Sequence, residues 1–507
     1  MTENEPKPPV PKIYPEGCVF NSIDDIKDKH VTVMGLGLNG GGEASVRFLL
    51  KHGAYVLATD MKTAEDLKTT IDSIAGDDSL DKSRLTYVLG EHRIEDFENA
   101  DCVIKNPGVK YDGNKYLAAA KNIETDISLF LHFTKAPIIA VTGSKGKSST
   151  VSAIYYGLKE AGFEAFLGGN ITVSPLTFLE KTNAKTPVVL ELSSWQLADL
   201  HGRKALKPFI TVITKIIPDH QNFYHSMLAY VADKKLIYAD QTKKDYAIFD
   251  FDADAAADGG TLIDNWGNIF AREAKSKILR YSRKPLPKGI DGVWFAKNLD
   301  GKCRFNGKEE TILKDLIVPG FHMRINVLNA ALVLKIMGVE AKKIIEILGK
   351  WNGIEHRLEY FHEWNGYKFY NDSAATVPEA AALASQSFGF PVTLLTGGTD
   401  KGLDLSPLSE TLANSSSIKP NAIYMLKGSA TDKLVPLFKE RGIETKGIFD
   451  DLTSMLTTLK EDLSKIECDP KTKKAVVFSP GATSFGMFKN EFDRGNQFKE
   501  KVREIFK

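Results

Sequence analysis

The chain has 507 residues, a length that predicts about three domains, each large enough to bury a core of its own. Its 43% hydrophobic and 26% charged residues are typical of a soluble globular protein. The net charge of +1 gives no electrostatic basis for binding nucleic acid or an acidic membrane surface. No uninterrupted run of about 18 apolar residues predicts a membrane span.

Residues 1–20 begin polar and proline-rich, so we expect a disordered arm there, and they lack the apolar core of a signal peptide. The four cysteines, Cys18, Cys102, Cys303 and Cys468, are scattered without paired spacing. This pattern fits a reduced cytoplasm and not a zinc or disulfide framework. We therefore expect a cytoplasmic monomer with no nucleic-acid or membrane partner.

The first glycine-rich turn follows an apolar strand at residues 31–34 and precedes a helix at 43–52. Gly35, Gly37 and Gly40, with Asp60 after the next strand, form a dinucleotide-binding fingerprint. The pattern leaves three alternatives open: an NAD-type cofactor, another nucleotide, or a plain Rossmann-like turn. A third strand, at 101–105, leads into Asn106-Pro-Gly108, where open α/β sheets keep their ligand loops.

A second glycine turn organises the middle of the chain. A β-branched strand at 138–142 breaks at Gly143 and Gly146, and a helix then runs from Lys147 to about residue 162. Backbone N–H groups, the Lys147 charge and the Ser148 hydroxyl would together bind phosphate and Mg²⁺. The strict P-loop spacing would place a glycine where this chain has Val141, so an ordinary strand–helix turn is the alternative.

Two later strands of this region end in residues suited to a Mg²⁺–nucleotide site. The strand at 187–191 ends in Glu191, a carboxylate of the kind that such a site needs beside its phosphate loop. The strand at 209–214 leads to Asp219-His220, and a helix after it carries Lys234. Taken alone, an Asp-His pair is more often a turn beside a surface imidazole than a functional site.

Residues 250–320 predict a small β-rich excursion, and a helix restarts near residue 326. From residue 353, strands at 391–395, 422–426 and 475–478 alternate with helices, which predicts a second doubly wound sheet. The expected fold class is therefore α/β, in three domains: a Rossmann-like domain at 1–134, a central P-loop ATPase-type parallel-sheet domain at 135–352 and a C-terminal Rossmann-like domain at 353–507.

In this order the motifs resemble the Mur ligases of bacterial cell-wall synthesis, from about residue 30 to the end of the chain. The family's phosphate loop matches residues 143–149, and its Glu-x-Ser-Ser-aromatic-Gln strand end matches 191–196. The family's Pro-Asp-His matches 218–220, and its His-Arg pair matches 356–357. The segment 479–495, with Ser479, Ser484 and Arg494-Gly495, resembles the family's glutamate-adding member.

The resemblance implies an ATP-dependent ligase that adds D-glutamate to UDP-N-acetylmuramoyl-L-alanine in peptidoglycan precursor synthesis. It implies that the first glycine loop holds the UDP of the sugar substrate and not NAD. The expected UDP-substrate residues are Gly37, Leu38, Asn39, Asp60, Asn106, Gly108, Asn170, Ser193, Gln196 and His220. The expected ATP-binding residues are Gly143, Ser144, Lys145, Gly146, Lys147, Ser148, Ser149, Asn326, Asn329, Arg357 and Asp372.

The catalytic residues implied by the resemblance are Lys147, Glu191, His220 and Lys234. Two Mg²⁺ ions would use Ser148, Glu191, His220 and a carbamylated Lys234, because an unmodified lysine is a cation and cannot ligate a metal. Transfer of the ATP γ-phosphoryl group would turn the substrate carboxylate into an acyl phosphate, which the glutamate amine would attack to give a tetrahedral intermediate.

The amino-acid pocket departs most from the family pattern. Ala374 replaces a lysine of the family's Asp-Ser-Lys-Ala-Thr motif, and Glu491 stands where an aromatic residue is usual. Lys215 replaces an asparagine near the triphosphate site. Thr376, Lys401 and Ser484 remain the candidates for binding the glutamate carboxylates, with an ordinary surface loop as the alternative.

Two other functions remain open at this point. One is a related ATP-dependent amino-acid ligase such as a folylpolyglutamate synthetase, which the UDP-type first domain argues against. The other is a non-catalytic nucleotide-binding relative. The presence of Lys147, Glu191, His220 and Lys234 argues against it, because a binding module would not need the second metal site.

Overall fold

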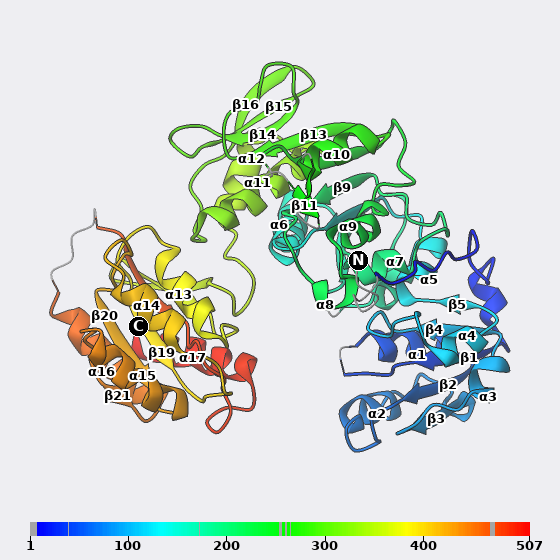
Figure 1. Cartoon of the computed structure of the whole chain (residues 1–507), viewed down its shortest axis with the longest axis horizontal. Helices are drawn as coiled ribbons and strands as arrows, with labels where there is room; N and C mark the ends of the chain where they lie inside the picture. The colour runs from blue at the N-terminus through cyan, green and yellow to red at the C-terminus, as the bar shows by residue number, and fades with distance from the viewer. Residues whose placement is uncertain are drawn as a thin grey trace. The chain divides into compact units, whose positions relative to one another are not determined.

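The computed structural model describes residues 8–38, 40–171, 173–252, 256–258, 261–263, 265–466 and 472–507. The chain folds into two compact units, one of Met1–Lys314 with Ile325–Ile347 and the other of Asp315–Arg324 with Leu348–Lys507. Three main sheets follow one another along the chain, which the colours of Figure 1 trace from blue through green to red. The α/β class with parallel sheets is confirmed, whereas the boundaries at 134 and 352 stay a prediction.

The first sheet has five parallel strands in the order β3-β2-β1-β4-β5, the arrangement of a Rossmann-like half. Its strands are β1 (His30–Met34), β2 (Tyr55–Asp60), β3 (Leu85–Leu89), β4 (Cys102–Lys105) and β5 (Ile123–Glu124). Its helices are α1 (Gly41–Lys51), α2 (Lys68–Ala75), α3 (Glu95–Glu98), α4 (Lys115–Ala119) and α5 (Asp126–Phe133). The sheet order reverses between β1 and β4, so their following loops meet at the switch point where such sheets bind ligands.

The second sheet has nine strands in the order β16-β15-β14-β13-β10-β9-β6-β8-β7. They are β6 (Ile138–Thr142), β7 (Phe166–Gly169), β8 (Val188–Glu191), β9 (Ile210–Ile213), β10 (Tyr246–Asp250), β13 (Lys277–Ser282), β14 (Gly292–Phe295), β15 (Gly301–Phe305) and β16 (Lys308–Leu313). The region expected as a β-rich excursion at 250–320 does form strands, but β13 to β16 extend this sheet, in which β15 pairs antiparallel with both β14 and β16. A two-stranded hairpin, β11 (Ala256–Asp258) with β12 (Thr261–Ile263), stands apart from it.

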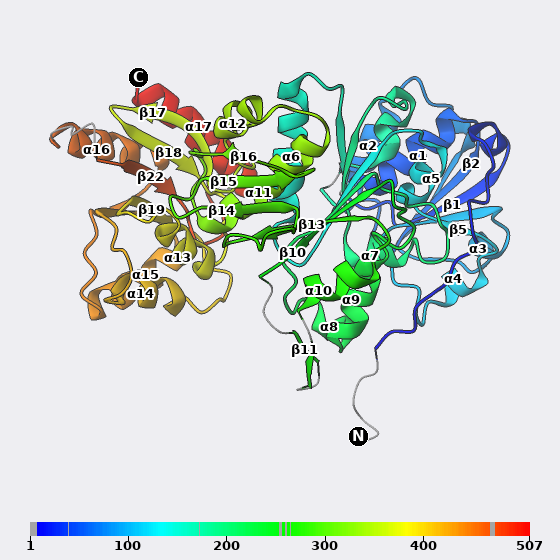
Figure 2. The ribbon, with the colours of Figure 1, turned by 90° about the horizontal axis from the view of Figure 1, so that it is seen from above.

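Helices cover both faces of the second sheet. They are α6 (Lys147–Ala161), α7 (Ser194–Ala198), α8 (Gln221–Tyr224), α9 (Met227–Lys235), α10 (Trp266–Glu273), α11 (Phe321–Ile336) and α12 (Ala341–Gly349). Figure 2 shows α9 and α10 on one side of β10 and β13, and α6 and α11 on the other. The central strands are buried on both faces, which is why they read as continuous apolar runs in the sequence.

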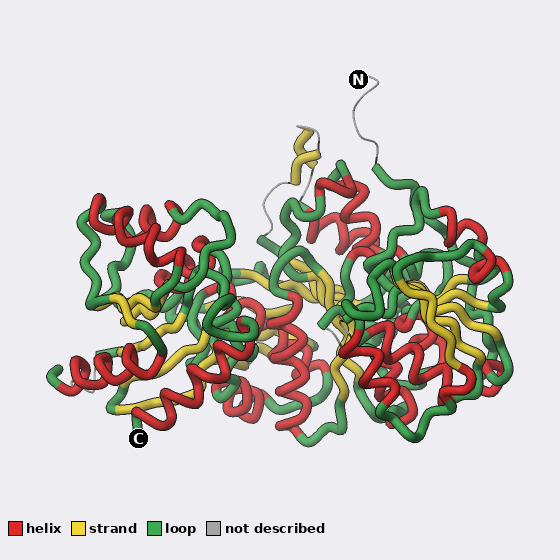
Figure 3. The backbone as a smooth tube through the Cα atoms, turned by 90° about the horizontal axis from the view of Figure 1, so that it is seen from below, coloured by secondary structure: helices red, strands yellow, loops and turns green. Residues whose placement is uncertain are grey.

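The second unit contains a six-stranded sheet in the order β17-β18-β22-β19-β20-β21. Its strands are β17 (Glu359–Trp364), β18 (Tyr367–Asn371), β19 (Thr393–Gly397), β20 (Ala422–Leu426), β21 (Ile448–Phe449) and β22 (Lys474–Phe478). Its helices are α13 (Pro378–Gln386), α14 (Ser406–Ala413), α15 (Ser429–Glu440), α16 (Leu452–Ser464) and α17 (Glu491–Ile505). Only β17 is antiparallel among these described strands, and Figure 3 shows this unit's strands in yellow with helices in red beside them.

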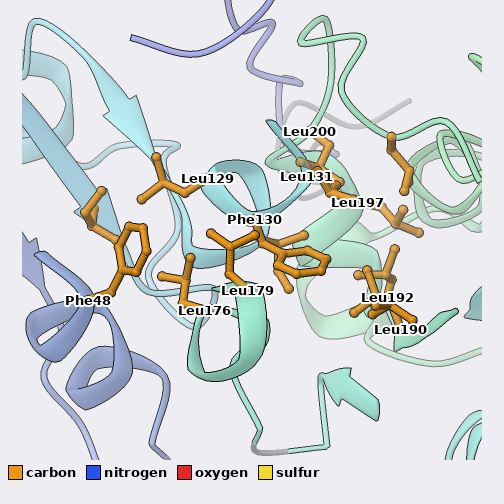
Figure 4. Close-up of a cluster of buried hydrophobic side chains, with 14 of the residues drawn as sticks. Phe48, Leu129, Phe130, Leu131, Leu176, Leu179, Leu190, Leu192, Leu197 and Leu200 are labelled. Atoms are coloured by element: carbon orange, nitrogen blue, oxygen red, sulfur yellow. The ribbon is translucent and has the colours of Figure 1, made fainter. Parts of the chain in front are cut away.

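One continuous apolar core joins the first two sheets. Phe48 of α1 and Phe130 of α5 belong to the same cluster as Leu190 of β8 and Leu197 of α7 (Figure 4). The Phe130 ring meets the Phe178 ring edge-on with centroids 5.7 Å apart. Shared burial of this kind holds the two sheets in one compact unit.

The N-terminal arm differs from the prediction. Among its described residues, Tyr14 and Phe20 are buried, and the Tyr14 backbone N–H donates to the His201 carbonyl at 2.8 Å. The expectation of a disordered arm through residue 20 is therefore wrong for this stretch. Composition alone suggested a solvated arm, but two aromatic side chains supply enough apolar area to order the chain.

Candidate functional site

The phosphate-loop pattern forms a strand, a glycine turn and a helix, as predicted. Gly143 and Gly146 adopt φ angles of 144° and 95°, in the region that favours glycine. A Cβ at Gly143 would lie 1.9 Å from Thr214 Oγ1, and one at Gly146 would lie 2.6 Å from Asn326 Oδ1. Both glycines are therefore required by close packing, and the loop leads directly into the N-terminus of α6.

The segment that directly follows β9, together with Tyr230 of α9, fixes the shape of this loop. Ser144 donates its backbone N–H to Lys215 O at 2.8 Å, and its hydroxyl lies 3.0 Å from the Tyr230 hydroxyl. Thr214 Oγ1 donates to Lys145 O at 2.8 Å. These hydrogen bonds fix the conformation of the loop, and the Ser144 and Lys145 N–H groups are used by Lys215 O, so an anion at the loop would meet the N-terminal turn of α6.

Lys147 begins α6 and turns back over the loop. Its Nζ donates to Gly143 O at 3.0 Å and to Ser144 O at 3.1 Å. Burial lowers the pKa of Lys147, while the charge of Glu191 opposes that shift. Ser148 and Ser149 follow in the first turn of the helix, and Lys145 lies on the exposed side with its Nζ 3.7 Å from Asp219 Oδ2.

Glu191 ends β8 as a buried carboxylate that is only half satisfied. Its Oε1 accepts a hydrogen bond from Asn170 Nδ2 at 2.9 Å. Its Oε2 is buried and has no hydrogen-bond partner among the described residues. An orphaned anionic oxygen is costly in the interior unless a cation satisfies it, so Glu191 fits the role of a Mg²⁺ ligand.

Lys234, on α9, lies directly against the phosphate loop. Its Nζ is buried, donates to Gly143 O at 2.9 Å and sits 4.6 Å from the centroid of the Tyr230 ring. Burial, reinforced by the nearby charge of Lys147, lowers the pKa of Lys234 to about 7. This lysine is therefore partly neutral at physiological pH, which an ordinary surface lysine is not.

His220 precedes α8 in a left-handed conformation with φ of 51°. Its ring lies 5.1 Å from the Trp195 ring and 6.3 Å from the Tyr230 ring, centroid to centroid. The described residues contain no cluster of three His, Cys, Asp or Glu side chains that could hold a metal. A metal site here would therefore depend on hydroxyl, carbamate and phosphate oxygens in addition to Glu191 and His220.

The residues expected on the adenine side lie in α11. Asn326 abuts Gly146, as described above. Asn329 is 1% exposed, and neither its amide nitrogen nor its amide oxygen has a hydrogen-bond partner within the described part of the chain. A buried amide with both ends unsatisfied is costly unless a ligand completes it, which suits a nucleobase edge.

The glycine loop of the first sheet is built around Asp60. Gly35, Gly37 and Gly40 all have positive φ angles, and Gly37 N donates to Asp60 Oδ2 at 3.0 Å. Asn106 Nδ2 donates to Gly35 O at 3.3 Å, so the loops after β1 and β4 touch. Leu38 is 52% exposed at the tip of the loop, and Asn39 lies outside the described residues.

Ser193 and Gln196 form a capping box at the start of α7. The Ser193 backbone N–H donates to Gln196 Oε1 at 3.0 Å, and the Gln196 N–H donates to Ser193 Oγ at 3.2 Å. Both side chains are therefore fixed near the end of β8, the strand that carries Glu191.

In the second unit, Asp372 follows β18 and is almost fully buried. Its two oxygens accept hydrogen bonds from Leu358 N at 3.1 Å and from Ser479 Oγ at 2.6 Å. Burial raises the pKa of Asp372 to about 7. Arg357 precedes Leu358, which places the guanidinium and this carboxyl on one connected loop system.

The three amino-acid-binding candidates approach one another in this unit. Lys401 Nζ lies 3.5 Å from Thr376 Oγ1. A short antiparallel bridge, with Thr399 N donating to Thr483 O at 3.1 Å and Thr483 N to Thr399 O at 2.9 Å, places the Ser484 segment beside the Lys401 segment. Two hydroxyls and an ammonium could together bind a carboxylate.

Comparison with known proteins identifies the family. Residues 141–334 match the Mur ligase middle domain. A protein of Treponema pallidum named UDP-N-acetylmuramoylalanine–D-glutamate ligase is 38% identical, over 95% of this chain and 98% of its own length. A protein of the same name from Roseiflexus is 33% identical, over 94% of this chain and 99% of its own. This chain belongs to the Mur ligase family.

Solved structures of Mur ligases share the fold. The UDP-N-acetylmuramate–alanine ligase MurC of Thermotoga maritima superposes with a TM-score of 0.52 at 17% identity, over 94% of this chain and 99% of that one. MurF of Acinetobacter baumannii gives a TM-score of 0.52 at 14% identity, over 82% of this chain and 93% of that one. The resemblance inferred from the ordered motifs is confirmed.

The sequence did not indicate that Arg494 of this Mur ligase is buried and holds two loops of the site together. Arg494 is 0% exposed; its Nε and Nη2 donate to Ser373 Oγ and O at 3.0 and 2.8 Å, and its Nη1 donates to Ala482 O at 3.0 Å. It thereby ties the Thr376 loop to the Ser484 loop. The motif that contains Arg494 was visible in the sequence, but its contact with Ser373, 121 residues away, was not.

Proposed function

We propose that this Mur ligase uses ATP to join D-glutamate to UDP-N-acetylmuramoyl-L-alanine, releasing ADP and phosphate in peptidoglycan precursor synthesis. Relatives that share 30–38% identity over about 95% of the chain carry the name of that ligase. The single structural observation that carries the proposal is Lys234, buried against Gly143 O with a pKa of about 7. A phosphate-binding protein without ligase chemistry has no need of such a lysine.

In this proposal ATP binds at the loop of residues 143–149. Lys147 and the backbone N–H groups at the start of α6 hold the phosphates. Asn326 and Asn329 of α11 face adenine, and Arg357 and Asp372 are the further ATP-binding residues of the proposal. Ser148, Glu191, His220 and Lys234 as a carbamate would hold two Mg²⁺ ions, which when bound would neutralise phosphate charge during transfer. The unpartnered Glu191 Oε2 supports this ligand set.

The reaction then proceeds in two chemical steps, and Lys147 acts on the transferred phosphoryl group in the first. Lys147 moves from the loop carbonyls to the phosphates and balances the charge that spreads over the transferred γ-phosphoryl group. The substrate carboxylate becomes an acyl phosphate as the bond to ADP breaks. The glutamate amine attacks the acyl carbon, phosphate leaves, and the amine proton passes to a base that we do not assign.

The UDP-substrate is proposed to bind where the first sheet's loops meet. Gly37, Leu38, Asn39 and the Asn106–Gly108 loop would contact the diphosphate, and Asp60 the uracil. Asn170, Ser193, Gln196 and His220 would line the muramoyl group. The contact of Asn106 with Gly35 supports a single site shared by both loops.

The incoming D-glutamate is proposed to bind through Thr376, Lys401 and Ser484. Ala374 removes a cation that other family members have, and Lys401, 3.5 Å from Thr376 Oγ1, replaces it. A charge-assisted hydrogen bond to a carboxylate is worth about 1.5–3 kcal/mol, enough to decide whether glutamate binds.

We also propose the three-domain division at 134 and 352 and a cytoplasmic monomer. Within the described residues, no helix is long and apolar enough to cross a membrane. Gel filtration with light scattering tests the monomer.

Phosphate release tests the function. The purified chain should release phosphate only when ATP, Mg²⁺, UDP-N-acetylmuramoyl-L-alanine and D-glutamate are all present. Replacing D-glutamate in turn by L-glutamate, D-alanine and D-glutamine gives the matched controls. Faster release with an uncharged amino acid would leave the ligase class standing and remove D-glutamate.

A further inference from the structure

Lys105 is the last residue of β4 and directly precedes the Asn106–Gly108 loop. Its side chain is 2% exposed. Its Nζ lies 2.7 Å from Val109 O, 3.3 Å from Asn106 O and 2.8 Å from Asp199 Oδ2. The ammonium donates hydrogen bonds to the two backbone carbonyls, and its contact with the Asp199 carboxylate is an ion pair.

Two of these oxygens define the shape of the loop. Asn106 O and Val109 O lie at its two ends, and Val109 N also donates to Asn106 O at 2.9 Å, which closes a tight turn. Lys105 therefore holds both ends of the turn from beneath. On the other side, Asn106 Oδ1 accepts from Gly108 N at 3.0 Å.

The third oxygen belongs to the other sheet's elements. Asp199 is the C-cap of α7, the helix whose N-terminus carries Ser193 and Gln196. Asp199 is 6% exposed, and its Oδ1 accepts a hydrogen bond from the Tyr14 hydroxyl at 3.4 Å. Lys105 thus joins the loop proposed for the diphosphate to the helix proposed for the muramoyl group.

Packing alone does not fix the loop. The loop borders a cavity that is lined by Pro107, Val109, Trp195 and Phe223 together with Lys105 and Asp199. A loop that borders a cavity has fewer van der Waals contacts to hold its conformation. A methionine would fill the space of Lys105 without a desolvation cost, so the polar contacts are what the ammonium adds.

We propose that Lys105 is a positioning residue for the UDP-substrate: it sets the Asn106–Gly108 turn and holds it in register with α7. The inference rests on the proposed function, because it assigns the turn and α7 to one substrate. Lys105 itself is too buried to touch the ligand.

The test compares three variants. Lys105→Met removes the contacts and leaves Asp199 an unpaired buried charge, so a fall in stability is expected. Lys105→Met with Asp199→Asn removes both charges and keeps an acceptor for Tyr14, which should restore most of the melting temperature. Lys110→Met removes an exposed lysine five residues further on, whose Nζ lies 3.8 Å over the Phe223 ring, and serves as the matched control.

The double variant should raise the KM for UDP-N-acetylmuramoyl-L-alanine at least ten-fold and change the KM for ATP and for D-glutamate less than two-fold. Amide hydrogen exchange at residues 105–112 should accelerate in the double variant and not in Lys110→Met. If the double variant kept the wild-type KM for the UDP-substrate and the wild-type hydrogen exchange at residues 105–112, Lys105 would serve only to neutralise the charge of Asp199. That result would overturn the proposal. If wild-type protein released no phosphate with these substrates, the proposed function would fail, while the exchange result would still decide whether Lys105 holds the turn.

Discussion

The environment of Lys234 allows its tendency to be carbamylated to be estimated as a number. A carbamate forms when a neutral amine attacks CO₂, so the neutral fraction of the lysine sets how readily it is modified. With an ordinary pKa of 10.5, only about one lysine in 3,000 is neutral at pH 7, whereas a pKa of about 7 leaves about half neutral. Burial against Gly143 O therefore increases the reactive fraction roughly a thousand-fold.

The pH dependence follows from the direction of this shift. A lowered lysine pKa means that the folded protein favours the neutral amine, which is lost as the pH falls through about 7. At a fixed concentration of dissolved CO₂, carbamate should therefore accumulate as the pH rises from 6 to 8. ¹³C NMR after equilibration with ¹³C-bicarbonate measures it as one carbamate signal.

Lys234→Ala is the variant that links the modification to activity. It should lack the carbamate signal and be inactive, and acetate should partly restore turnover by supplying the missing anionic oxygen. Lys235→Ala, which removes the half-buried neighbour that pairs with Glu273, is the matched control and should keep the signal and the activity. Full activity in Lys234→Ala, or no carbamate in the wild-type protein at pH 8, would refute the reasoning.

Three further predictions concern the other subsites. Lys147→Ala should abolish turnover, because Lys147 lies in the phosphate loop, and its affinity for the UDP-substrate, measured by calorimetry, should stay within three-fold of the wild type. An equal loss of affinity for ATP and for the UDP-substrate would count against the assignment. Lys401→Ala should raise the KM for D-glutamate ten-fold or more, whereas Ala374→Lys should change it little; the reverse pattern would show that the pocket lacks a cation. The pKa of Asp372 is raised to about 7, so ionisation of this carboxyl should destabilise the folded wild-type protein as the pH rises from about 4 to 7. Between pH 5 and pH 8 the free energy of unfolding, measured in urea, should therefore fall by about 2–3 kcal/mol less in Asp372→Asn than in the wild type. An equal fall in both proteins would contradict this.

The strands and glycine turns could be predicted because their signals are local. The apolar run before Gly143 and the glycines at 35, 37 and 40 each encode one turn within a few residues. The apolar strand that ends in Glu191 pointed to that carboxylate in the same way, and the ordered motifs added the family and with it the role of Lys234. Neither needed a contact between distant segments.

What could not be predicted depends on such contacts. The sequence predicted Lys105 only as the polar end of a strand. Nothing near Lys105 in the sequence indicates its contact with Asp199, 94 residues further on. The residues after 250 predicted a β-rich region but not the sheet that it extends, because pairing with β10 depends on contacts between distant segments. A lysine at the end of a fully apolar strand was the one available signal for Lys105, since burying a cation requires partners.

Transfer of labelled oxygen tests the central claim most directly. UDP-N-acetylmuramoyl-L-alanine labelled with ¹⁸O in its free carboxylate is incubated with ATP, Mg²⁺ and D-glutamate, and the products are analysed by mass spectrometry. The proposed reaction predicts one ¹⁸O in the released phosphate, because that oxygen leaves with the acyl phosphate, and a product heavier by one glutamyl residue. Unlabelled phosphate, or labelled phosphate without the glutamyl product, would contradict it.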